Sequence, residues 1–67
     1  DIIFLDPPYK NDDGELALKI IAEREILSEN GVAVLEKDRE GAEITGLTKQ
    51  KIKKYGKAIF TFYKKNV

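Results

Sequence analysis

The order of apolar and polar residues divides the first half of the chain into a strand, a helix and a second strand. Residues 1–5 (Asp-Ile-Ile-Phe-Leu) and residues 32–35 (Val-Ala-Val-Leu) are apolar runs without alternation. Such runs are typical of strands that a parallel sheet buries on both faces. Between them, apolar residues recur at helical spacing over residues 15–29: Leu16, Ile20 and Leu27, with Ile21 beside this stripe. Asn30-Gly31 is a usual helix stop, so the pattern predicts one βαβ crossover with a parallel pair of strands.

The second half of the chain predicts a hairpin. Residues 39–48 are polar and contain glycine, which indicates a loop, and two strands follow over residues 50–55 and 57–63 with Gly56 at the turn. Alternation in the second strand places these residues on two faces: Ala58, Phe60 and Phe62 on one, Lys57, Ile59, Thr61 and Tyr63 on the other. We expect Phe60 and Phe62 in the core, and Tyr55 and Tyr63 as partly buried packing residues. The predicted fold class is α/β, with a mixed sheet whose last strand runs antiparallel.

Composition narrows the chemistry that the chain can perform. Its 67 residues contain no cysteine and no histidine, which removes disulfides, thiolate metal sites and the commonest general base. The lack of disulfides fits a reducing compartment, and we expect a cytoplasmic protein with no membrane association, because no apolar run is long enough to span a bilayer. The chain also lacks methionine and begins at a strand. We therefore expect residues 1–67 to be a part of a longer domain.

Charge is distributed unevenly along the chain. Residues 1–48 carry 12 acids and 5 bases, a balance of −7, whereas residues 49–67 carry seven lysines and no acid, a balance of +7. The lysines at positions 49, 51, 53, 54 and 57 have two interpretations: contacts to nucleic-acid phosphates, or the solvated side of an exposed hairpin.

The segment with the clearest chemistry is Asp6-Pro-Pro-Tyr9, which follows the first predicted strand. In open α/β sheets, ligands bind beyond the carboxyl ends of the strands. Each of the first two residues precedes a proline, so both are expected to be extended and the loop stiff. The Asp6 carboxylate and a backbone carbonyl, that of Pro7 for preference, can accept the two N–H groups of an exocyclic amine, and Tyr9 can stack on the base that carries it. The alternative is a rigid turn in which Asp6 caps neighbouring amides.

Asp6-Pro-Pro-Tyr9 resembles the (Asp/Asn)-Pro-Pro-(Tyr/Phe) motif of amino-directed, S-adenosylmethionine-dependent methyltransferases. Three further stretches are similar to the C-terminal half of the bacterial 16S rRNA guanine-N2 methyltransferases of the RsmD type: residues 21–27 (Ile-Ala-Glu-Arg-Glu-Ile-Leu), residues 31–36 (Gly-Val-Ala-Val-Leu-Glu) and residues 55–57 (Tyr-Gly-Lys). The likeness covers nearly the whole chain, and its first motif is the specific one.

This resemblance implies the C-terminal half of a Rossmann-like class I methyltransferase sheet, with residues 1–67 as a partial methyltransferase domain. It also implies that Asp6, Pro7, Pro8 and Tyr9 form the catalytic site, that S-adenosylmethionine is the cofactor of the full-length protein, and that ribosomal RNA or the small ribosomal subunit is the partner. The glycine-rich cofactor loop of the family is missing, because Gly14, Gly31, Gly41, Gly46 and Gly56 are scattered. On this resemblance the 67 residues alone are expected to be inactive, and no residue is assigned to the cofactor.

Other interpretations stay open at this point. The same loop chemistry serves enzymes that methylate DNA adenine or a protein glutamine amide, and a non-catalytic α/β fragment would need the loop only as a turn. Glu36 either faces the same crevice or is solvated. Lys10, Asp12 and Asp13 follow the loop, and contact with the substrate is one interpretation of them. Asp12 with Glu15 resembles a capping box, which makes helix capping its expected role.

Overall fold

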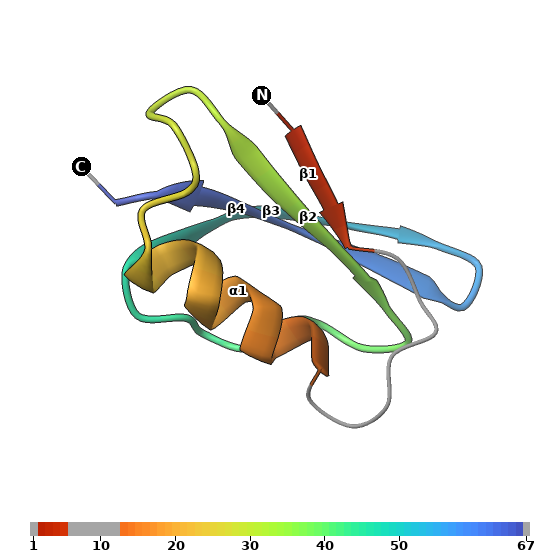
Figure 1. Cartoon of the computed structure of the whole chain (residues 1–67). Helices are drawn as coiled ribbons and strands as arrows, with labels where there is room; N and C mark the ends of the chain where they lie inside the picture. The colour runs from red at the N-terminus through yellow and green to blue at the C-terminus, as the bar shows by residue number, and fades with distance from the viewer. Residues whose placement is uncertain (1, 6–12, 67) are drawn as a thin grey trace.

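The computed structural model describes residues 2–5 and 13–66, with the side chain of Asp13 excepted. Four strands and one helix follow one another in the order β1 (Ile2–Leu5), α1 (Asp13–Glu23), β2 (Val32–Lys37), β3 (Leu47–Tyr55) and β4 (Ala58–Lys65). The strands form one sheet in the order β1-β2-β4-β3 (Figure 1). β1 and β2 are parallel, and β4 is antiparallel to both of its neighbours. The predicted mixed sheet with an antiparallel last strand is confirmed. It is compatible with part of a Rossmann-like fold.

Gly56 forms the turn of the β3–β4 hairpin as predicted. Its φ is 59°, and Tyr55 pairs with Ala58 across the two-residue turn. A glycine at the first central position is what a type II′ turn needs, because side chains strain that backbone conformation. Both strands extend beyond the predicted bounds, since β3 begins at Leu47 and β4 continues to Lys65.

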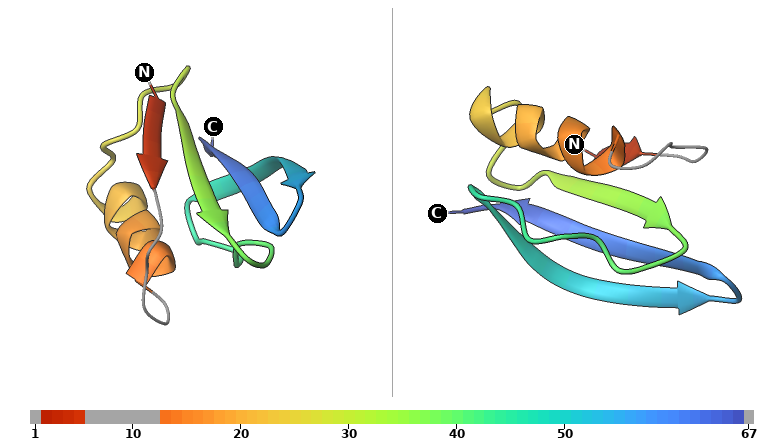
Figure 2. Two further views of the ribbon diagram at one scale, coloured as in Figure 1. Left: turned by 90° about the vertical axis from the view of Figure 1, so that its right-hand side faces the viewer. Right: turned by 90° about the horizontal axis from the view of Figure 1, so that it is seen from below.

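The core lies on one face of the sheet, between the strands, α1 and the loop 38–46. Figure 2 shows α1 lying along this side of the sheet. Its buried apolar members come from every described element except β1: Leu18, Ile21, Leu27, Ala33, Leu35, Ile44, Leu47 and Tyr63. Ile3 and Leu5 of β1 pack against this cluster from the edge.

The opposite face of the sheet is covered by no described element, and two predictions about it are wrong. Ile2 and Phe4 of β1 are 76% and 50% exposed, so this strand is buried on one face only. Phe60 and Phe62 also lie on this face and are half-buried instead of being in the core. The reason is that the described part of the chain supplies a single helix, which covers only the other face.

The helix ends six residues earlier than the pattern predicts, at Glu23. Glu25 adopts a left-handed backbone with φ 51°, and the Ile26 and Glu25 amides donate to the carbonyls of Ile21 and Ala22 over 3.1 and 3.3 Å. These two bonds are those of a Schellman cap. A glutamate is an unusual residue for a left-handed position, which costs about 1 kcal/mol, and for this reason the sequence gives no signal of the cap.

The predicted apolar stripe of the helix is also wrong. Leu16 and Ile20 are exposed, whereas Leu18 and Ile21 are buried. The early cap takes Leu27 out of the helix, and Leu27 reaches the core from the segment that follows. The buried side of α1 is thus set by Leu18 and Ile21, which are three residues apart.

Tyr63 is a packing residue, as predicted, and is completely buried. Tyr55 is more exposed than predicted, because its side chain at the hairpin turn is 61% exposed and packs only edge-on against Phe60. Within the described residues, no helix combines the length and the apolar character that crossing a bilayer would need.

Candidate functional site

The candidate catalytic residues Asp6, Pro7, Pro8 and Tyr9 lie outside the described residues, as do Lys10 and Asp12. The structure instead describes what flanks them. Leu5, the last residue of β1, pairs with Leu35 of β2, and α1 begins at Asp13. β1 and β2 run parallel, so Asp6 follows the carboxyl end of a parallel strand in the sequence. In open α/β sheets, ligands bind beyond the carboxyl ends of the strands.

An ion pair between Glu15 and Lys37 links the start of α1 to the end of β2. The Lys37 ammonium lies 3.0 and 2.9 Å from the two carboxylate oxygens of Glu15. Both side chains are largely buried, with 13% and 12% of their surface exposed. A carboxylate in the first turn of a helix is also favoured by the helix dipole. The residues on either side of the 6–12 segment are therefore both linked to β2: Leu5 by strand pairing and Glu15 by this ion pair.

Burial works to raise the pKa of Glu15, but the hydrogen bonds and charge of Lys37, with backbone hydrogen bonds, outweigh it. The pKa of Glu15 is therefore lowered below its usual value. A carboxyl group whose pKa is lowered on folding stabilises the protein above its unfolded-state pKa. That contribution disappears as the pH falls through the folded-state pKa.

We expect the Glu15→Gln variant to be less stable than the wild-type protein at neutral pH, because it replaces the ion pair with a neutral amide. The difference in free energy of unfolding should shrink as the pH falls below the usual range of glutamate, since protonated Glu15 resembles glutamine. Urea unfolding of both proteins at a series of pH values measures this. Glu29→Gln is the matched control, because Glu29 is exposed in the segment after α1. A difference that stays constant down to acid pH would contradict the assigned role of Glu15.

The loop 38–46 is fixed across the helix side of β4, although the sequence indicated only a polar loop. The Gly41 amide donates to the Thr61 hydroxyl over 2.9 Å, and the Tyr63 hydroxyl donates to the Ala42 carbonyl over 2.8 Å. Thr61 and Tyr63 are completely buried. Burial, with smaller effects from the charges of nearby glutamates, raises the pKa of Tyr63 far above the usual range of tyrosine. Its hydroxyl is thus a permanent hydrogen-bond donor to this loop.

Lys49 is part of the same arrangement. Its ammonium lies 2.7 Å from a carboxylate oxygen of Glu40 and 3.3 Å from one of Glu43. The hydrogen bond to Glu40 is the main cause of a raised pKa for Lys49. Lys49 therefore already has two carboxylate partners within the fold.

The turn of the β3–β4 hairpin lies at the same end of the strands as the carboxyl end of β1. Leu5 pairs with Leu35, Leu35 with Thr61, and Thr61 with Ile52 in one row across the four strands. From this row β3 continues to Tyr55, so the turn projects beyond it (Figure 1). Glu36 pairs with Phe60 and lies on the face opposite to α1. The described segments at this end of the sheet are therefore the carboxyl ends of β1 and β2 and the hairpin turn.

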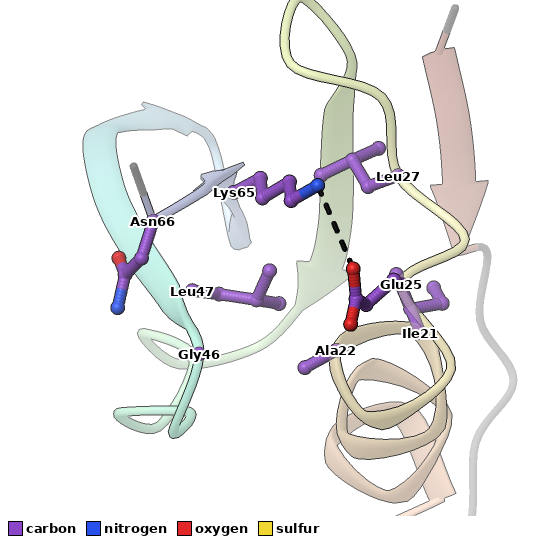
Figure 3. A pocket seen from close by; sticks show the side chains of 8 residues that line it. All are labelled: Ile21, Ala22, Glu25, Leu27, Gly46, Leu47, Lys65 and Asn66. Atoms are coloured by element: carbon purple, nitrogen blue, oxygen red, sulfur yellow. Dashed lines mark ion pairs between the residues drawn. The ribbon is translucent and has the colours of Figure 1, made fainter.

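A pocket of about 240 Å³ lies at the opposite end of the sheet, where β3 begins and β4 ends (Figure 3). Its lining is mostly apolar, with one ion pair at the mouth in which the Lys65 ammonium lies 3.9 Å from a Glu25 carboxylate oxygen. Ile21, Leu27 and Leu47 form much of its interior. The pocket lies at the opposite end of the strands from Leu5, the last residue of β1. Its lining has neither a glycine-rich loop nor an acid without an ion-pair partner that could bind a ribose. It therefore does not fit a methyl-donor cofactor.

Metal binding has no support in the described part of the chain. No group of three or more acidic, histidine or cysteine side chains lies close enough there to bind an ion.

Comparison with known proteins identifies the family. The family described as "Conserved hypothetical protein 95" matches residues 1–64. Neither the search of curated proteins nor the search of solved structures gave a match. The match covers almost the whole chain, and the family is that of the RsmD-type methyltransferases, whose members use S-adenosylmethionine. The chain therefore belongs to the Conserved hypothetical protein 95 family of methyltransferases.

Proposed function

We propose that residues 1–67 are part of a methyltransferase domain that transfers a methyl group from S-adenosylmethionine to the exocyclic N2 amine of a guanine in 16S ribosomal RNA. One observation carries this proposal: Asp6-Pro-Pro-Tyr9 directly follows the carboxyl end of a strand in a parallel pair, in a chain that the methyltransferase family matches over residues 1–64. The small ribosomal subunit is the proposed partner.

The loop is proposed to orient the amine. The Asp6 carboxylate accepts one N–H of the amine and the Pro7 carbonyl accepts the other, so the nitrogen lone pair is directed away from both acceptors. In the reaction the nitrogen takes the methyl group of S-adenosylmethionine, which leaves as S-adenosylhomocysteine. The nitrogen carries positive charge in the transition state and then gives up one proton to solvent. A carboxylate and a carbonyl dipole that are already in place stabilise this charge without reorganisation. Neither group has to be a strong base, which suits a chain without histidine.

The base itself is proposed to stack on Tyr9, with Pro8 limiting the movement of the loop. Stacking of this kind stabilises a base that has left its own helix by about 1–3 kcal/mol. Both described flanks of the loop are linked to β2, Leu5 by strand pairing and Glu15 by its ion pair with Lys37. The cofactor supplies the methyl group.

RNA is preferred to the other amine substrates for two reasons. Asp6 is an aspartate, whereas glutamine-directed enzymes and many adenine-directed ones carry asparagine at this position. The resemblance in the second half of the chain, at residues 55–57, is to the ribosomal RNA enzymes. DNA adenine and a protein glutamine amide are the alternatives that an experiment has to separate.

The experiment supplies the full-length protein with radiolabelled S-adenosylmethionine and three acceptors: 30S subunits that lack guanine-N2 methylation, duplex DNA and a release-factor-like protein. We expect label on the 16S RNA of the 30S subunits, and on N2-methylguanosine after digestion to nucleosides. Label on DNA or protein alone would replace the proposed substrate with one of the alternatives. An absence of label from all three acceptors would contradict the proposed function.

A further inference from the structure

The tip of the β3–β4 hairpin combines positive charge with an exposed aromatic ring. We use "basic tip" for residues Lys51, Lys53, Lys54, Tyr55 and Lys57. Residues 47–65 contain no acidic residue. The basic tip therefore has no charge partner within its own hairpin.

The lysines of this hairpin differ in their charge partners. Lys64, near the open end, is half-buried and has no ion-pair partner among the described side chains. Lys49 and Lys65, nearer its open end, form ion pairs with glutamates outside the hairpin. Lys53, Lys54 and Lys57 are exposed, and none of the three has an ion-pair partner among residues 2–5 and 14–66. Lys51 lies 4.9 Å above the ring of Phe62, a cation–π contact that keeps its charge over the face opposite to α1. Lysines without an ion-pair partner among the described side chains are thus most numerous at the end of the hairpin that projects past the end of β1.

Tyr55 is an exposed ring whose position is fixed from one side. It contacts Phe60 edge-on, with ring centroids 5.7 Å apart and an interplanar angle of 78°. Phe60 in turn stacks with Phe4 at 6.3 Å and 8°. This row of three rings runs from the basic tip to β1, one residue before the strand ends at Leu5. Tyr55 therefore has packing support on one side and 61% of its surface open to solvent.

The location of the basic tip relates it to the site. Ile52 lies in the same row across the sheet as Leu5, and β3 continues for three residues beyond it. At the usual rise of a strand, the turn therefore projects about 10 Å past the end of β1. A polyanion bound to the basic tip would lie beside the carboxyl end of β1, after which the Asp6 loop begins.

We propose that the basic tip binds the backbone of single-stranded RNA next to the target nucleotide, with the lysines contacting phosphates and Tyr55 stacking on a base. Lysines beside an exposed ring are the combination that single-stranded nucleic acid needs, whereas an acidic protein partner would use the lysines alone. The proposal rests on the proposed function only in taking the neighbouring Asp6 loop as the site of methyl transfer. Binding by the basic tip is measurable without methyl transfer.

The test compares two triple variants of the full-length protein that lose the same charge. One is Lys53→Gln, Lys54→Gln and Lys57→Gln in the basic tip. The other is Lys19→Gln, Arg24→Gln and Lys64→Gln, which changes two positions on the helix side and one at the far end of β4. The probe is a fluorescent, unstructured RNA of roughly a dozen nucleotides, and the dissociation constant is measured at a series of salt concentrations.

We expect the basic-tip variant to bind this RNA on the order of tenfold or more weakly at low salt. Its plot of log affinity against log salt should be shallower by about 2, because three phosphate contacts to a single strand each contribute about 0.7. The control variant should keep the wild-type affinity and slope. Equal losses in both variants, or no loss in the basic-tip variant, would overturn the proposal.

Tyr55→Leu separates stacking from charge. This variant keeps an apolar side chain against Phe60, so the fold is retained, and it should bind RNA about 5- to 100-fold more weakly with an unchanged salt slope. Unchanged affinity would remove Tyr55 from the proposed surface. A loss of RNA binding in the basic-tip variant, together with an absence of methyl transfer in wild type, would support the inference and contradict the proposed function. Normal methyl transfer by the wild type, together with unaffected RNA binding in the basic-tip variant, would support the proposed function and contradict the inference.

Discussion

Replacing Asp6 with alanine is expected to lower the turnover of methyl transfer by about two to three orders of magnitude. This is the usual effect of removing one preorganised group that stabilises transition-state charge. The variant leaves the second acceptor, the Pro7 carbonyl, in place, and Tyr9 can still stack on the base. Binding of the acceptor RNA should therefore change much less than turnover.

Asp6→Asn and Asp38→Ala make this test specific. Asparagine keeps one acceptor oxygen and occurs at the first position of the wider amino-methyltransferase motif, so Asp6→Asn should retain more activity than Asp6→Ala. Asp38 is an exposed carboxylate after β2 that pairs with Arg39 at 3.5 Å, and its removal should leave turnover unchanged. Turnover and acceptor affinity are measured for each variant, with thermal unfolding to show that the fold is intact. Wild-type turnover in Asp6→Ala would refute the role of this carboxylate.

Substituting Gly41 with alanine is expected to destabilise the protein by about 2–3 kcal/mol, the upper part of the range for overpacked interiors. A Cβ atom at this position would collide with the Tyr63 hydroxyl and would lie 3.1 Å from a methyl group of Leu35. Neither neighbour has room to move away, because both side chains are completely buried and the hydroxyl is bonded to Ala42.

A double-mutant cycle with Tyr63→Phe identifies the cause. The phenylalanine variant loses the hydrogen bond to Ala42 at a cost of about 1 kcal/mol, but it also removes the atom that the new Cβ meets. The double variant should therefore be more stable than the sum of the single effects by about 1 kcal/mol or more, measured by urea unfolding. Gly56→Ala is the control for backbone strain alone, since its Cβ would meet nothing within 4 Å while its φ is +59°. Strict additivity of Gly41→Ala and Tyr63→Phe would show that the collision is not the cause.

The elements that the sequence predicts well are those with local signals. The first two strands, the turn at Gly56 and the face pattern of Thr61 and Tyr63 depend on residues close together in the chain. The end of β1 at Leu5 has the same kind of local signal, because a short apolar run ends there.

Features that depend on distant partners could not be predicted. Glu15 and Lys37 are 22 residues apart, and Gly41 bonds to a side chain 20 residues away. Glutamate and lysine are both common on solvated surfaces, so the sequence does not show that these two side chains are buried as an ion pair. The insertion of β4 between β2 and β3 is of the same kind, since both the observed order and a simple meander contain the same hairpin.

The sheet order also determines when the molecule can be completed during synthesis. Chains leave the ribosome amino end first. β2 therefore emerges with one hydrogen-bonding edge unpaired, and β3, although made next, does not fill it. Residues 58–65 must arrive before β3 is joined to the rest of the sheet. A premature stop before Ala58 would leave β3 unpaired and β2 with an open edge, a state that invites aggregation and that protein quality control would remove.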